Sequence, residues 1–123
     1  MKKILVIDDE PDITISVKNG LERKGFEIHT HNDPLKALEE FKSDVYDLIL
    51  IDIRMPKMNG FELYREIKKK NDTKVKICFF TAFEVYYDEF RKMFPNLEVK
   101  CFIRKPITIN DLVTHINTEL ERN

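Results

Sequence analysis

The run DLILIDIRMPKMNGFEL, residues 47–63, decides the fold of this chain. Its first half is a short apolar segment rich in Leu and Ile, which is typical of a strand buried on both faces of a parallel sheet. The apolar residues stop at Asp52, and Asn59-Gly60 precedes a segment of helical period with Leu63 and Ile67 on one stripe. The run therefore predicts a β–α unit with a carboxylate at the end of its strand.

Other apolar runs end at polar residues in the same way. The predicted strands are Lys3–Ile7, Phe26–Thr30, Asp47–Ile51, Val75–Phe80 and Val99–Ile103. The polar residues at or just beyond their ends include Asp8, Asp9, Asp52, Thr81 and Lys105. In an open parallel sheet, ligands bind outside the carboxyl ends of the strands. We therefore expect three carboxylates, a hydroxyl and an ammonium at one edge of a sheet, where they suit magnesium and phosphate.

Segments of helical period follow each predicted strand. The first is expected to stop near Gly25, and the fourth to run from about Glu84 to Met93. The inward stripes are Ile13, Val17 and Leu21 in the first, Ala37, Leu38 and Phe41 in the second, Leu63 and Ile67 in the third, and Ile109, Leu112, Val113, Ile116 and Leu120 in the last. Capping residues are Asp33 before Pro34, and Thr108 with Asp111. Five β–α units imply parallel strands with helices on both faces.

Composition indicates one domain over residues 1–123, with no repeat and no linker. Hydrophobic residues make up 42% and charged residues 35%, and 21 basic against 22 acidic residues give a formal net charge of −1. This balance offers no support for binding nucleic acid or a membrane through bulk charge. No apolar run approaches the length of a membrane span and no signal peptide is evident, which favours a cytoplasmic protein.

The two cysteines, Cys78 and Cys101, each fall inside a predicted strand. They lack metal-ligand spacing, and free cysteine is among the most buried residue types. We therefore expect reduced thiols that pack in the core. If their strands are neighbours the two sulfurs are close, which leaves a redox role open.

Taken in order, these motifs resemble the receiver domains of response regulators in two-component signalling. The resemblance covers essentially the whole chain and rests on Asp8-Asp9-Glu10, on Asp52 within residues 47–63, on Thr81-Ala82 and on Lys105-Pro106. Each motif alone is more often a turn, a cap or a solvated lysine, so the ordered combination carries the resemblance. It implies an α/β, flavodoxin-like, doubly wound sheet of five parallel strands in the order 2-1-3-4-5.

The resemblance implies that Asp52 is the phosphoacceptor. It would attack the phosphorus of a phosphohistidine and form an aspartyl-phosphate. Asp9 and Asp52 would bind Mg²⁺ (or Mn²⁺) directly and Asp8 mainly through a water, with the main-chain carbonyl of Arg54 as a further ligand. Such a protein is a signalling phosphoacceptor and not an enzyme acting on other substrates.

The remaining site roles also follow from the resemblance. Lys105 would pair with a phosphoryl oxygen, and the Thr81 hydroxyl would hydrogen-bond another. Movement of Thr81 would let the ring of Phe102 turn inward and change the outer surface. The peptide bond before Pro106 is expected to be cis, as is frequent in the family.

Two positions that tune phosphoryl lifetime in this family carry Arg54 and Phe83 here. An amide or carboxylate at these positions orients the attacking water, and neither residue can do so. We therefore expect slow loss of the phosphoryl group.

The expected partners are a sensor histidine kinase or phosphotransfer protein and an unknown downstream protein target. Exposed aromatic residues often mark contact surfaces. The aromatic fourth helix, with Tyr86, Tyr87 and Phe90, is therefore a candidate partner surface. The resemblance implies that the output face is formed by the fourth helix, fifth strand and fifth helix. Ile15 lies off its helix stripe and is expected to be exposed, and the resemblance implies that it contacts the kinase together with Pro106. The chain is expected to be a monomer or a phosphorylation-dependent dimer.

Three alternatives stay open. The first is a receiver cut from a longer regulator with a DNA-binding or enzymatic output domain. The second is an aspartyl-phosphate phosphatase, which usually carries a second acid two residues after the nucleophile, where this chain has Arg54. The third is an FMN-binding flavodoxin-like module, which needs a Ser-, Thr- or Gly-rich phosphate loop where this chain has acidic residues after the first strand.

Overall fold

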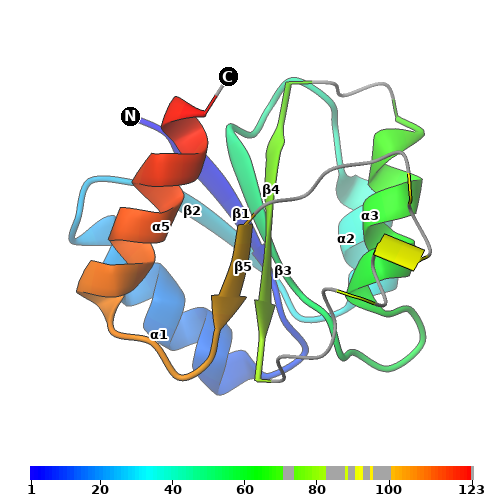
Figure 1. Ribbon diagram of the computed structural model, residues 1–123, viewed down its shortest axis with the longest axis horizontal. Coiled ribbons are helices and arrows are strands. Elements are labelled where there is room, and N and C mark those ends of the chain that lie inside the picture. The colour runs from blue at the N-terminus through cyan, green and yellow to red at the C-terminus, as the bar shows by residue number, and fades with distance from the viewer. Residues whose placement is uncertain (71–73, 83–87, 89–90, 93–94, 96–100, 123) are drawn as a thin grey trace.

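The computed structural model describes residues 1–70, 74–82, 88, 91–92, 95 and 101–122 (Figure 1). Strands and helices alternate along this part of the chain. The strands are β1 (Lys3–Ile7), β2 (Glu27–His31), β3 (Leu48–Asp52), β4 (Lys76–Thr81) and β5 (Cys101–Arg104). The helices are α1 (Pro11–Glu22), α2 (Pro34–Glu40), α3 (Gly60–Lys68) and α5 (Ile109–Glu121).

The five strands form one parallel sheet in the order β2-β1-β3-β4-β5. The chain starts in the middle of the sheet, moves to β2 at one edge, and crosses back over β1 to add β3, β4 and β5. The direction of growth therefore reverses between β1 and β3. A doubly wound sheet binds ligands at the carboxyl ends of its strands beside such a reversal. The predicted fold class and strand order are confirmed.

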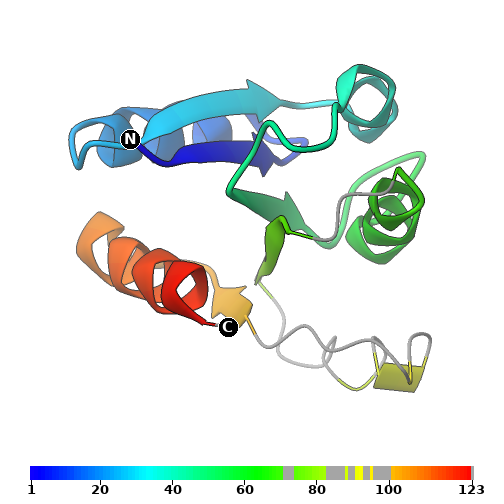
Figure 2. The ribbon, with the colours of Figure 1, turned by 90° about the horizontal axis from the view of Figure 1, so that it is seen from above.

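Helices cover both faces of the sheet (Figures 1 and 2): α1 and α5 lie on one face, and α2 and α3 on the other. Each face has its own apolar cluster, because successive side chains of a strand point to opposite faces. In β1, Leu5 and Ile7 pack on the α2–α3 side, while Ile4 and Val6 pack on the α1–α5 side. The central strand β3 is buried at every position, which explains its unbroken apolar run.

The helix ends follow the local signals of the sequence. Asp33 accepts a hydrogen bond from the Leu35 amide at the start of α2, and Thr108 accepts one from the Asp111 amide at the start of α5. The chain leaves the region of α1 through Gly25 at a φ of 93°, a conformation that favours glycine. Phe41 follows the last residue of α2 and is buried, as its place on the predicted stripe requires.

Two strand boundaries differ from the sequence prediction in a way that bears on the site. Asp52 and Thr81 were expected just after strands, but they are the last residues of β3 and β4. The sheet ladder extends to these polar residues because neighbouring strands pair with them, Asp52 with Phe80 and Thr81 with Arg104. Both side chains are therefore held by regular strands and not by loops.

The cysteine prediction was wrong. Cys78 and Cys101 are joined in a disulfide, whereas the sequence favoured reduced packing thiols. They lie directly opposite each other on β4 and β5. Spacing along the chain does not reveal strand register, which explains the error.

Much of the predicted fourth helix, residues 84–93, lies outside the described residues. Within the part that the structure describes, no helix has the length and apolar character needed to cross a bilayer.

Candidate functional site

Four of the predicted site residues come together at the carboxyl edge of the sheet. Asp8 directly follows β1, Asp52 ends β3, Thr81 ends β4 and Lys105 directly follows β5. These four strands include the two centre strands beside the topological reversal. The Lys105 backbone N–H donates to the Thr81 carbonyl over 2.7 Å, so the last pair of strands stays bonded up to the site.

The loop after β1 is held in place by hydrogen bonds to its backbone. Asp8 accepts the Glu10 amide through Oδ1 over 3.0 Å, which fixes the turn into α1. Asn32 uses its Nδ2 group to donate to the Asp8 carbonyl over 2.8 Å and to the Thr14 hydroxyl oxygen over 2.9 Å. Thr14 is buried in the first turn of α1. Asn32 therefore links the end of β2 both to Asp8, where the acidic loop Asp8-Asp9-Glu10 begins, and to the helix that follows this loop.

The loop after β3 is closed against the strand that carries Asp52. The Gly60 amide donates to the Ile53 carbonyl over 2.8 Å. A Cβ at Gly60 would lie 2.5 Å from the Asp52 carbonyl oxygen and 2.9 Å from the Ile53 Cα, so the position accepts only glycine without a backbone shift. Asn59 and Glu62 form a capping box that fixes the start of α3 beside this contact.

Lys105 stands between two carboxylates. Its Nζ lies 2.6 Å from Asp8 Oδ2 and 3.6 Å from Asp52 Oδ1, and 4.8 Å from the centroid of the Phe80 ring. Burial lowers the pKa of Lys105, but the hydrogen bond to Asp8 and the charges of Asp52 and Asp8 outweigh burial, so the pKa is raised overall. The side chain is therefore a fixed positive charge at the edge of the sheet.

The carboxyl of Asp52 titrates far from its usual range. Burial, followed by the neighbouring charge of Asp8, raises the pKa of Asp52 to about 7, and Asp9 adds to this effect while Lys105 opposes it. Asp52 is 5% exposed and Asp8 is 1% exposed. The ammonium of Lys105 only partly offsets the repulsion between these buried carboxylates. A further positive charge at the site would therefore be stabilising.

The acidic residues fit a hard divalent cation. Asp8, Asp9 and Glu10 each offer a carboxylate oxygen, and these oxygens lie within 4.8 Å of one another. Oxygen donors at such spacing are what Mg²⁺ prefers, since it takes one or two carboxylates and keeps several waters. Glu10 was not expected to be a ligand from the sequence, although it belongs to the Asp8-Asp9-Glu10 motif.

The two candidate switch residues lie on the neighbouring strands β4 and β5. Thr81 is buried at the end of β4. Phe102 is half-buried in β5, and its ring centroid lies 5.4 Å from that of Phe79, the residue opposite it on β4. The Lys105-Pro106 peptide bond is cis, as the resemblance implied.

The other predicted site residues are less enclosed or are not described. Arg54 and Pro106 are exposed, and Ile15 is 58% exposed on α1, as its position off the helix stripe required. Phe83, Tyr86, Tyr87 and Phe90 lie outside the described residues. Asn32 was missed by the sequence analysis, because no local pattern indicates that its amide contacts a loop 24 residues earlier in the chain.

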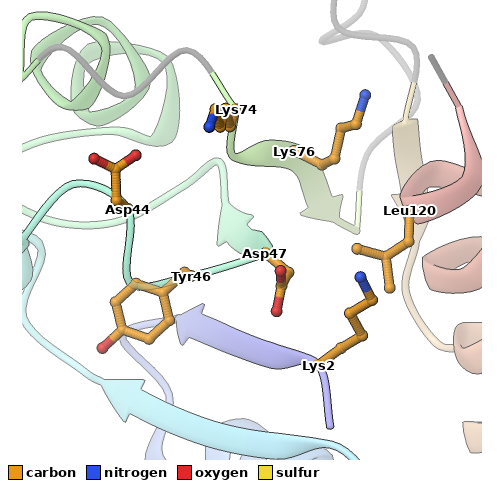
Figure 3. Close-up of a pocket in the computed structure, with 7 residues that line it drawn as sticks. All are labelled: Lys2, Asp44, Tyr46, Asp47, Lys74, Lys76 and Leu120. Carbon is orange, nitrogen blue, oxygen red and sulfur yellow. The ribbon is translucent and has the colours of Figure 1, made fainter.

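A pocket of about 380 Å³ lies at the opposite edge of the sheet (Figure 3). Its lining residues are Lys2, Asp44, Tyr46, Asp47, Lys74, Lys76 and Leu120. Polar groups there serve the fold: Asp47 accepts the Lys3 amide over 2.8 Å, and Lys76 donates to the Arg122 carbonyl over 2.6 Å. The pocket holds none of the carboxyl-edge residues and is separate from the candidate site.

Comparison with known proteins decides the family. The model of the response regulator receiver domain matches residues 4–117. The chain belongs to the response regulator receiver family. Like other members, it is a receiver domain of the kind that acts in signal transduction.

Sequence and structural relatives agree with this assignment. The chain is 31% identical to the response regulator ArlR of Staphylococcus saprophyticus over 99% of its length, and 32% identical to the transcriptional regulatory protein CpxR homolog of Haemophilus influenzae over 100%. It spans about half the length of these curated relatives, 54% and 52%. The response regulator TrrA of Thermotoga maritima, solved in complex with Mg²⁺ and BeF, has a TM-score of 0.80 and 36% identity, with 96% of this chain and 98% of that chain covered.

Proposed function

We propose that this receiver accepts a phosphoryl group on Asp52 in a Mg²⁺-dependent reaction. The observation that carries the proposal is the placement of Asp52 at the end of a central strand, with Lys105 Nζ at 3.6 Å and Asp8 beside it. Phosphoryl transfer depends mainly on positioning and on stabilising charge. The Asp52 carboxylate is held by the regular strand β3, and the ammonium of Lys105 lies close enough to stabilise a phosphoryl group on it.

Asp8, Asp9 and Asp52 would hold the cation, with the Arg54 carbonyl as a further ligand. When bound, Mg²⁺ supplies positive charge that offsets the repulsion among the carboxylates and the incoming phosphoryl oxygens. Binding requires that Asp52 be ionised. Because its pKa is raised to about 7 without the cation, cation binding and loss of the Asp52 proton should support each other.

Asp52 would act as the nucleophile through one carboxylate oxygen. The new bond joins that oxygen to phosphorus, and the bond from phosphorus to the donor nitrogen breaks. Lys105, already within ion-pair distance of Asp8 and Asp52, would pair with a phosphoryl oxygen, and Thr81 would offer its hydroxyl to another. The protein then promotes only its own phosphorylation and dephosphorylation.

The partners belong to the same proposal. The donor would be a sensor histidine kinase or a phosphotransfer protein, received at a surface that includes the exposed Ile15 and Pro106. The readout would be a protein target that contacts the surface of the fourth helix, β5 and α5, with a change at Thr81 and Phe102. The protein would act in the cytoplasm, as a monomer or as a dimer that forms on phosphorylation.

A receiver within a longer regulator is the second candidate. It is favoured because this chain spans only about half the length of the curated relatives that it matches. The chemistry proposed at Asp52 is the same in both cases.

A long phosphoryl lifetime is expected from Arg54 and Phe83. Neither side chain can orient a hydrolytic water through a carboxylate or amide oxygen. An Arg54→Asn, Phe83→Glu variant should lose its phosphoryl group on the order of tenfold faster than the wild type. Equal lifetimes would show that neither side chain limits hydrolysis.

The test of phosphorylation uses a small phosphoryl donor. The protein is incubated with phosphoramidate, with and without Mg²⁺, and its intact mass is followed beside an Asp52→Asn variant. We expect a gain of one phosphoryl group that requires both Mg²⁺ and Asp52. No gain in the wild type, together with no binding of beryllofluoride, would refute the proposal.

A further inference from the structure

Cys78 and Cys101 face each other across the last pair of strands. They are opposite in the register of β4 and β5, their Cα atoms are 4.6 Å apart, and a disulfide joins them. They are the only cysteines of the chain. Both are buried, Cys78 at 0% and Cys101 at 6% exposure, and they pack on the α1–α5 side of the sheet with Leu112 and Ile116.

The disulfide lies next to the candidate switch residues. Phe102 follows Cys101 directly, and Thr81 is three residues beyond Cys78 on β4. The next pair of the ladder is Phe79 with Phe102, whose rings are in contact. A covalent bond at this position therefore ties together the two strands that carry the candidate switch residues.

We propose that Cys78 and Cys101 are a reversible redox site that modulates the phosphoryl site at Asp52. This inference rests on the proposed function for its cytoplasmic setting and for its consequence at Asp52, whereas the thiol chemistry of the pair can be tested without it. The fold has an apolar cluster on each face of the sheet. A chain of this length buries enough apolar surface to be stable without a disulfide. In proteins of this kind that work in a reducing compartment, disulfides are usually transient and redox-sensing.

Cys78 and Cys101 can become accessible to a thiol or disulfide reagent when the edge strand β5 separates locally from β4. In the part of the chain that the structure describes, β5 spans Cys101–Arg104 and is an edge strand that pairs with β4. A short edge strand can open locally without unfolding the central strands. Cys101 lies on this edge strand and Cys78 lies on the inner strand β4, so local opening of β5 would expose the sulfur of Cys101 before that of Cys78.

The chemistry is thiol–disulfide exchange with a low-molecular-weight disulfide such as glutathione disulfide. The Cys101 thiolate attacks one sulfur of glutathione disulfide, forms a mixed disulfide and releases one glutathione thiolate. The Cys78 thiolate then attacks the Cys101 sulfur and releases the second. Two cysteine thiols lose two electrons, one glutathione disulfide gains them, and the two protons pass to the released thiolates.

The consequence follows from linkage between two states of β4 and β5. The disulfide stabilises the arrangement of the strands in which it forms. If phosphorylation favours another arrangement at Thr81 and Phe102, oxidation must weaken binding of the phosphoryl group, and phosphorylation must favour reduction by the same factor. Couplings of this kind are typically 5-fold or more.

The first measurement counts thiols and needs no phosphoryl chemistry. The full chain is equilibrated in buffers with different ratios of glutathione to glutathione disulfide and quenched in acid. Its free thiols are then alkylated under denaturing conditions and counted from the intact mass. We expect two alkylated cysteines at one end of the series, none at the other, and the same curve from both directions. Two thiols at every ratio, or none at every ratio, would overturn the redox site. An Asp52→Asn variant should also interconvert between the two forms.

The second measurement tests the coupling. Oxidised and reduced protein are titrated with beryllofluoride in the presence of Mg²⁺, and bound fluoride is followed by ¹⁹F NMR. We expect the oxidised form to bind at least fivefold more weakly. We also expect beryllofluoride to shift the glutathione midpoint towards the disulfide-rich buffers. Equal affinities would overturn the modulation.

A Cys101→Ala variant provides the matched control. It cannot form the disulfide, so its affinity for beryllofluoride should equal that of the reduced wild type and should not respond to glutathione disulfide. If this variant does not fold, the comparison of the two wild-type forms still decides. Failure of both wild-type forms to bind beryllofluoride would refute the proposed function and the coupling together, while the thiol count would still decide the redox site.

Discussion

Lys105 lies closer to Asp8 than to Asp52: its Nζ is 2.6 Å from Asp8 Oδ2 and 3.6 Å from Asp52 Oδ1. The ammonium is therefore anchored by a carboxylate that is 1% exposed and is already within ion-pair distance of the candidate acceptor. A small reorientation would bring it from Asp52 to an oxygen of a phosphoryl group there. We therefore expect the contact between Lys105 and Asp8 to matter both for stability and for phosphoryl uptake.

Replacing Lys105 by Met should damage both properties. The change leaves the buried Asp8 carboxylate without its ammonium, which should lower the free energy of unfolding by about 3 kcal/mol without Mg²⁺. Loss of the charge that pairs with the phosphoryl group should slow phosphoryl uptake on the order of 100-fold. Urea unfolding and the intact-mass assay measure the two effects. A Lys42→Met variant, which changes an exposed lysine, should match the wild type in both.

The stability of the metal-free protein should fall as pH rises from about 4 to about 7. Over this range Asp52 is ionised in the unfolded chain but keeps its proton in the folded protein, where its pKa is about 7. The folded state then binds more protons, so the free energy of unfolding decreases with pH. Above this range the carboxylate is ionised in both states and the loss is complete.

An Asp52→Asn variant tests that linkage. It removes the titrating group, so above pH 7 it should melt about 5 °C higher than the wild type without Mg²⁺. Added Mg²⁺ should raise the melting temperature of the wild type and narrow the difference. A Glu39→Gln variant controls for charge at an exposed position. Parallel pH profiles for wild type and Asp52→Asn would show that Asp52 does not titrate as described.

Asn32 should act as a positioning residue for the acidic loop. Its Nδ2 group holds the Asp8 carbonyl and the Thr14 hydroxyl. An Asn32→Ala variant should raise the Mg²⁺ concentration needed for half-maximal phosphoryl uptake about tenfold, as is common when a residue supporting metal ligands is lost. Uptake at saturating Mg²⁺ should recover. The matched control, Asn117→Ala, changes an exposed residue of α5, and an unchanged Mg²⁺ requirement for Asn32→Ala would rule out this role.

Gly60 and Gly20 form a matched pair of tight positions. A Cβ at Gly60 would strike the backbone of Asp52 and Ile53, whereas one at Gly20 would strike only the side chain of Ile109. Gly60→Ala should therefore cost about 2 kcal/mol and slow phosphoryl uptake roughly tenfold, since the end of β3 must shift. Gly20→Ala should leave uptake within about twofold of wild type, because a flexible side chain can move. Equal rates of phosphoryl uptake by the two variants would show that the close contact at Gly60 does not affect phosphorylation of Asp52.

The strand-end residues could be predicted from sequence because each sits where an apolar run stops. Asp8, Asp52, Thr81 and Lys105 meet as expected, since parallel strands present their carboxyl ends at one edge. The sequence does not specify the order of distances within the site. That Lys105 prefers Asp8 depends on side-chain packing around a buried carboxylate.

What the sequence did not reveal depends on register and on contacts across the fold. Cys78 and Cys101 are 23 residues apart, and their pairing requires the alignment of β4 with β5. The contact of Asn32 with Asp8 likewise joins the loops after two neighbouring strands. Neither relationship leaves a local pattern in the chain.

The most direct measurement locates the phosphoryl group on the chain. Protein phosphorylated by phosphoramidate with Mg²⁺ is reduced with borohydride, which converts an aspartyl-phosphate to homoserine, and is then digested and sequenced by mass spectrometry. We expect homoserine at position 52 and nowhere else. Homoserine at position 8 or 9, with Asp52 unchanged, would refute Asp52 as the phosphoacceptor.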